Sequence, residues 1–130
     1  NYKEIFKAVD YMKPMITTVG ITTREFAQKN PKKIAAIIEG YRKAVKYTYE
    51  HPDEAADIMA KHSNMKADLL KRSIGHVAPS KFWTDGALDP VELNNMVQGL
   101  QTIGLMDPGA VEWQKLIDQS YLPADLKRKL

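Results

Sequence analysis

The chain has 130 residues, of which 44% are hydrophobic and 27% charged, and its 19 basic and 16 acidic residues give a net charge of +3. This composition is that of a folded globular protein and excludes an intrinsically disordered chain. No apolar run approaches the ~20 residues that a membrane-spanning helix needs. Zero cysteines exclude disulfides, thiolate metal sites and cysteine nucleophiles. Basic and acidic residues are interleaved except at Lys127-Arg128-Lys129, a pattern that argues against a nucleic-acid-binding protein.

The first 21 residues contain the strand candidates. Residues 2–11 are ambiguous between a short helix and an edge strand, and Pro14 ends either one because the residue before proline is disfavoured in helical geometry. Residues 15–21 are rich in β-branched side chains and predict a strand, MITTVGI. A lone strand leaves its N–H and C=O groups unsatisfied. Its partner is therefore either residues 2–11 or a strand outside this chain.

The remainder of the chain predicts a succession of helices. Asn30-Pro31 and His51-Pro52 each place proline at a first helical position, where its missing N–H has no helical partner to lose. Asp89-Pro90 repeats this arrangement with a strong capping residue. Between the first two prolines, apolar residues spaced by three and four predict an amphipathic helix. The predicted helices span about residues 23–30, 31–50, 52–62, 65–75, 90–103 and 111–120.

The sequence offers little catalytic chemistry. His51, His62 and His76 lack the spacing of metal ligands, so no metal site is predicted. The seven glycines are scattered and form no phosphate-binding loop. The serines lack the context of a nucleophile elbow. We therefore predict no catalytic residue and no cofactor.

The best candidate ligand contacts are Phe82 and Trp83, in the predicted loop between two helices. A tryptophan in such a loop can stack on a small molecule or form the wall of a cleft. The alternative is that Trp83 packs over a helix as part of the core. Thr18 is a third candidate because its hydroxyl can bind an anion, although strand propensity explains a threonine there equally well.

The order and spacing of the helix starts resemble one protein family. The relevant run is TTREFAQKNPKKIAAIIEGYRKAVKYTYEHPDEAADIMAKH. It is similar to the C-terminal part of the solute-binding proteins of ABC importers, in the branch for nitrate, sulfonates, taurine and the pyrimidine precursor of thiamine. The later run FWTDGALDPVELNNMVQGLQTIGLMDPG and Leu122-Pro123 resemble the closing section of that family, so the resemblance covers nearly the whole chain.

The resemblance implies an α/β fold of the type II periplasmic-binding-protein kind, of which residues 1–130 are the C-terminal portion. The chain itself is then mostly α-helical with one or two β-strands, and residues 15–21 are a strand of a central sheet. The N-terminal lobe is absent from this chain. The implied protein is not an enzyme. It binds a small-molecule ligand in a cleft that closes between two lobes and then docks on an ABC permease, in the periplasm or anchored outside the cell.

Two alternatives remain open at this point. The amphipathic helices alone would permit a stand-alone helical protein-interaction module, which predicts a self-contained core with residues 15–21 either paired within the chain or not a strand. An enzyme of the same fold, like the pyrimidine-precursor synthase, is the second alternative. It would need a histidine or lysine cluster related to a cofactor, which the sequence does not display.

Overall fold

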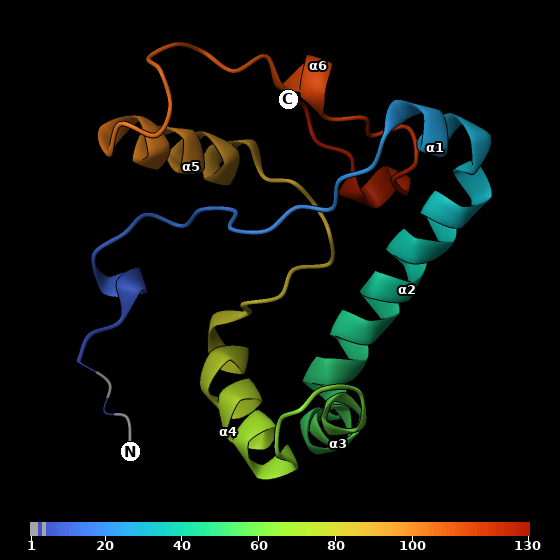
Figure 1. The fold of residues 1–130 in the computed structure, drawn as a ribbon, viewed down its shortest axis with the longest axis vertical. Helices are drawn as coiled ribbons and strands as arrows, with labels where there is room; N and C mark the ends of the chain where they lie inside the picture. The colour runs from blue at the N-terminus through green and yellow to red at the C-terminus, as the bar shows by residue number, and fades with distance from the viewer. Residues whose placement is uncertain (1–2, 4) are drawn as a thin grey trace. The chain divides into compact units, whose positions relative to one another are not determined.

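The computed structural model describes residues 3 and 5–130, and this part of the chain is helical (Figure 1). Two units make up the chain: Ala27–Ala87 is one, and Asn1–Phe26 together with Leu88–Leu130 is the other. The α-helices are α1 (Arg24–Lys29), α2 (Pro31–Glu50), α3 (Pro52–His62), α4 (Ala67–Val77), α5 (Pro90–Thr102) and α6 (Trp113–Leu116). In the described residues they are accompanied by the 3₁₀ turns η1 (Ala8–Asp10), η2 (Ala78–Ser80) and η3 (Ala124–Leu126).

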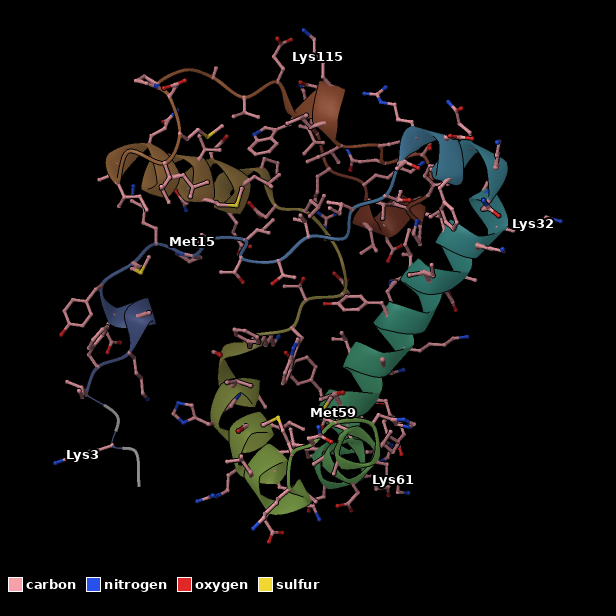
Figure 2. The ribbon with its side chains drawn as sticks, in the orientation of Figure 1. Lys3, Met15, Lys32, Met59, Lys61 and Lys115 are labelled. Carbon is pink, nitrogen blue, oxygen red and sulfur yellow. The ribbon has the colours of Figure 1, made fainter. Side chains whose placement is uncertain are left out.

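The Ala27–Ala87 unit has its core where α3 packs on α4. Ala56 is fully buried, and Leu70 and Ile74 of α4 close over it. The small alanine side chain lets the two helices approach closely. Met59, labelled in Figure 2, packs against this cluster together with Ala60 and Trp83. These six residues are called the α3–α4 cluster below.

Proline starts three helices, but the residues before the prolines act differently. Asn30 and His51 make no side-chain cap hydrogen bond, so α2 and α3 depend on the proline itself and on packing. Asp89 caps α5, since its Oδ1 accepts from the backbone N–H groups of Val91 at 2.7 Å and Glu92 at 3.3 Å. Of these three helices, α5 therefore has the start that its local sequence determines most strongly.

The other unit is held by a few buried side chains and by side-chain hydrogen bonds to the backbone. Leu93 and Val97 of α5 are buried, as is Leu126 of η3. Asn95 Nδ2 donates to the carbonyl oxygen of Pro14 at 2.8 Å, which fixes the start of the irregular segment 14–23 against α5. Trp113 Nε1 donates to Asn94 Oδ1 at 2.9 Å.

The predicted strand at residues 15–21 was wrong for this chain. The described residues form no strand, and 15–21 carry no regular secondary structure. The physical reason is the lack of a partner, because a strand is stable only when another strand accepts and donates its ladder hydrogen bonds. Of the other candidate strand, Tyr2 and Glu4 lie outside the described residues, while Ala8–Asp10 forms η1.

Two predicted helix ends also differ from the structure. α4 begins at Ala67 and continues to Val77, so Gly75 lies inside the helix and does not end it. The helix predicted over 111–120 is reduced to Trp113–Leu116. Ile117 is already extended, and Asp118 Oδ1 accepts from the Ser120 N–H at 2.9 Å. This local hydrogen bond competes with helix continuation.

Large apolar side chains remain on the surface of the chain. Ile21 is 90% exposed and Ile37, in the middle of α2, is 64% exposed. Charged side chains such as Lys32 point away from α2, as Figure 2 shows. Each of the two units therefore carries at least one large apolar side chain that the described chain leaves in solvent. None of the helices in the described residues has the length and apolarity to cross a membrane.

Candidate functional site

The structure places a groove of about 580 Å³ between α2 and the chain that follows α4. This volume is in the range of small-molecule sites, ~300–1,000 Å³. One wall is a single face of α2, because its residues are spaced by three and four. The opposite wall is η2 and the Trp83 loop, which we define as residues 81–87. The groove is lined by Arg42, Val45, Lys46, Tyr49, Ala78, Lys81, Trp83, Thr84 and Asp85; we call it the α2 groove.

Trp83 has two roles in this arrangement. It lines the α2 groove, and it also packs on the α3–α4 cluster. One side of Trp83 is therefore part of the groove wall, and another is part of the core. Phe82 lies beside it in an edge-to-face contact with ring centroids 5.4 Å apart, and is 60% exposed. Thr18 is exposed and belongs to the other unit.

Tyr49 holds the backbone of Trp83. Its Oη accepts from the Trp83 N–H at 2.8 Å and donates to the Trp83 carbonyl oxygen, also at 2.8 Å. The two rings are 6.2 Å apart at their centroids and tilted by 56°. Sequence analysis missed Tyr49. The spacing of Arg42, Lys46 and Tyr49 places them on one helical face, but it does not indicate that the Trp83 loop packs there.

The α2 groove is bordered by more positive than negative charge. Arg42, Lys46 and Lys81 line it, against the single carboxylate of Asp85. Lys46 also faces Glu50 at 3.8 Å, an exposed pair that contributes little. Burial raises the pKa of nearby Tyr41, and Tyr49 and Asp85 add to that rise. This lining of aromatic rings and cations suits a small anion with an apolar body.

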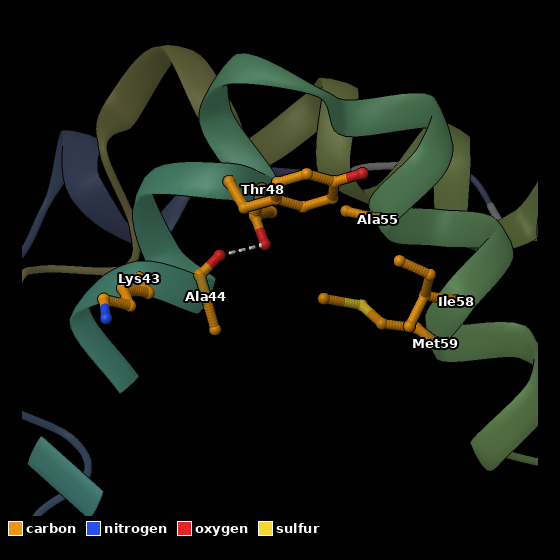
Figure 3. Close-up of a pocket in the computed structure, with 7 residues that line it drawn as sticks. Lys43, Ala44, Thr48, Ala55, Ile58 and Met59 are labelled. Carbon is orange, nitrogen blue, oxygen red and sulfur yellow. Dashed lines mark hydrogen bonds between the residues drawn. The ribbon is translucent and has the colours of Figure 1, made fainter. Parts of the chain in front are cut away.

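A second groove, of about 460 Å³, lies between α2 and α3 (Figure 3). Ala44, Ala55, Ile58 and Met59 make its lining apolar, and Thr48 Oγ1 is already used in a 2.8 Å hydrogen bond to the Ala44 carbonyl oxygen. It lacks converging polar groups and so offers less chemistry than the α2 groove. Within the part of the chain that the structure describes, no group of three or more His, Asp or Glu side chains could hold a metal ion.

The comparison with protein families gives a match to the first part of the chain. Residues 2–55 match the sequence model described as NMT1/THI5 like. This segment is similar to the NMT1/THI5-like family. The family comprises binding proteins for nitrate, sulfonates, taurine and thiamine precursors, so the resemblance is confirmed. No curated protein matches the chain, and no solved structure does.

The NMT1/THI5-like match covers less than half of the chain. It includes Thr18, both Asn30-Pro31 and His51-Pro52, and the α2 wall of the groove. Phe82 and Trp83 lie beyond it. At the level of the family, the match supports a solute-binding or related function.

Proposed function

We propose that this chain is part of the extracytoplasmic solute-binding component of an ABC importer. The solute would be of the sulfonate, taurine, nitrate or pyrimidine-precursor class. The observation that carries the proposal is the NMT1/THI5-like match of residues 2–55. The resemblance of the later run, from Phe82 to Gly109, extends the same assignment toward the C-terminus.

The lining of the α2 groove supports a ligand of this kind. A sulfonate or nitrate is attracted by the cationic side chains of Arg42, Lys46 and Lys81, and an organic body gains by contact with the Trp83 ring. Trp83 is accordingly proposed as a ligand contact, and Phe82, which lies beside it but does not line the groove, is proposed as a second contact. Thr18, which belongs to the other unit, is proposed separately as a hydroxyl that can donate to an anion.

The exposed apolar side chains support the proposal that the complete protein has a further part, the N-terminal lobe of the family, which covers them. Residues 15–21 have strand-type side chains, yet no strand in the described residues pairs with them. Val19 is 48% exposed and Ile21 90% exposed. A sheet edge in the N-terminal lobe would satisfy the backbone groups of this segment and cover both side chains. In this proposal the complete protein docks on a membrane permease, in the periplasm or anchored outside the cell.

The structure bears differently on the two alternatives, a stand-alone helical module and an enzyme of the same fold. A stand-alone helical module agrees with the missing strand, but it requires a self-contained core, and the side chains of Ile21, Ile37 and Phe82 remain in solvent. The family description also names THI5, a synthase-like member, so an enzyme of the same fold is the second candidate. In the described residues no group of three or more His, Asp or Glu side chains could hold a metal ion for such an enzyme.

A thermal-shift panel on the intact protein tests the proposal. Taurine, an alkanesulfonate, nitrate and the thiamine pyrimidine precursor would be compared at equal ionic strength with sodium chloride. A ligand at 100 times its Kd stabilises the folded state by about 2.7 kcal/mol, which raises Tm by several degrees. We expect one class to do so. If no class shifts Tm beyond the sodium chloride control, solute binding of this kind is wrong.

A further inference from the structure

The two hydrogen bonds between Tyr49 and Trp83 form an unusual connection. A backbone N–H and C=O of the same residue are normally satisfied by a neighbouring strand or a helical turn. At Trp83 a single side-chain hydroxyl satisfies both, as acceptor and as donor, at 2.8 Å each. The residues are 34 positions apart, so this contact ties the Trp83 loop to α2 and not to its own neighbours.

The backbone on both sides of Trp83 is irregular, which increases the importance of that contact. Lys81 lies in the left-handed region with φ 50° and ψ 46°, a conformation that is costly for a residue with a Cβ. Gly86 has φ 95°, where glycine is needed. A conformation like that of Lys81 persists only when surrounding interactions impose it. At Lys81 the backbone N–H caps η2 by donating to the Ala78 carbonyl oxygen at 3.0 Å, and the Tyr49 bonds hold the chain two residues further on.

Packing alone does not determine the position of the loop. The α3–α4 cluster contacts Trp83, but Trp83 remains only partly buried, and the neighbouring Phe82 is 60% exposed. Apolar contact is non-directional and permits the indole to slide or rotate on the cluster. The paired hydrogen bonds are directional and define where the Trp83 backbone lies along α2.

We propose that Tyr49 is the positioning residue of the α2 groove. Its hydroxyl fixes the Trp83 loop on α2, and through that loop it sets the wall that Trp83, Thr84 and Asp85 form. The relevance of this wall to a ligand rests on the proposed function. The positioning itself does not, because it concerns only contacts within the Ala27–Ala87 unit.

The fluorescence of Trp83 itself reports whether the Trp83 loop keeps its position on α2. Trp113, the other tryptophan, is replaced by Phe, and Tyr49→Phe is then introduced into this Trp113→Phe background. Acrylamide quenching of Trp83 fluorescence is measured in the folded state, whose helix content is checked by circular dichroism. We expect Tyr49→Phe to raise the quenching constant at least twofold and to shift the emission to longer wavelength, because the ring stays and only the hydroxyl is lost.

Tyr47→Phe is the matched control. It removes a tyrosine hydroxyl from the same helix, one that donates to Glu54 Oε2 and not to Trp83. We expect its quenching constant to equal that of the background. Equal quenching in Tyr49→Phe, with or without a lower Tm, would overturn the proposal and leave Tyr49 a merely structural residue.

Amide hydrogen exchange in the unmutated chain provides a second measurement, for the case in which Tyr49→Phe fails to fold. The Trp83 N–H should exchange at least tenfold more slowly than the amides of Phe82 and Thr84, since hydrogen-bonded amides exchange only on opening. Exchange of all three at similar rates would overturn the positioning role. Neither measurement involves a solute, so failure here is distinguishable from failure of the proposed function.

Discussion

Ile74→Ala tests whether the α3–α4 cluster holds the Ala27–Ala87 unit together. Ile74 is only 2% exposed and forms one buried cluster with Ala56 and Leu70, against which Trp83 packs. Replacement of a buried isoleucine by alanine costs about 2–5 kcal/mol, from lost transfer free energy and from the cavity left behind. The cluster is small and includes a flexible methionine that can move into the space. We therefore expect the lower part of that range, about 2–3 kcal/mol.

Urea denaturation of the 130-residue chain measures this loss. In the Trp113→Phe background, Trp83 fluorescence reports the cluster on which that ring packs. With an m value of about 1–3 kcal/mol/M, the loss lowers the urea midpoint by roughly 0.7–3 M. The helix content before the transition should remain near that of the parent chain, because alanine favours helix more than isoleucine does.

Ile37→Ala is the control for Ile74→Ala. It makes the same chemical change in a helix, but Ile37 is 64% exposed in this chain. Surface substitutions of this kind stay within about 0.5 kcal/mol of the parent. If Ile74→Ala also stays within that limit, the cluster is not the source of stability in the Ala27–Ala87 unit, and the reasoning is refuted.

Three further substitutions test separate contacts. Asp89→Ala removes the cap of α5 and should cost about 1 kcal/mol in thermal unfolding, whereas Asp107→Ala should cost less than half of that. Trp83→Ala should weaken solute binding in the intact protein as well as lower its stability; unchanged calorimetric affinity would assign Trp83 to the core alone. Hydrogen bonds from Ser120, chiefly from its side chain and then from its backbone N–H, lower the pKa of Asp118 from its ordinary value of 3.8. The ionised Asp118 carboxylate therefore stabilises the fold above pH 3.8, and this stabilisation is lost as the pH falls through the lowered pKa. Ser120→Ala should raise the Asp118 pKa toward 3.8 in an NMR titration, and no change would show that the hydroxyl is not involved.

The helix starts could be predicted from the sequence because their cause is local. Pro31, Pro52 and Pro90 each stand at the first position of a helix in the structure. A fixed φ and a missing donor act within one turn and need no tertiary partner. The Glu39–Lys43 ion pair on α2, at 3.1 Å, follows from a spacing of four in the same way.

The strand and the groove depend on distant partners, which a single sequence does not display. Residues 15–21 have β propensity, but propensity becomes a strand only when another strand is available. Tyr49 and Trp83 are 34 positions apart, and no local pattern joins them. The aromatic pair Phe82-Trp83 was found because aromatic residues in loops are rare enough to stand out, whereas Tyr49 resembles any other residue on an amphipathic helix.

Isothermal titration calorimetry of the intact protein tests the central claim most directly. The solutes are taurine, an alkanesulfonate, nitrate and the thiamine pyrimidine precursor, each titrated into folded protein. We predict saturable binding of one solute class with a stoichiometry of one. Absence of binding heat for all four, at several temperatures and with the fold verified by circular dichroism, would contradict it.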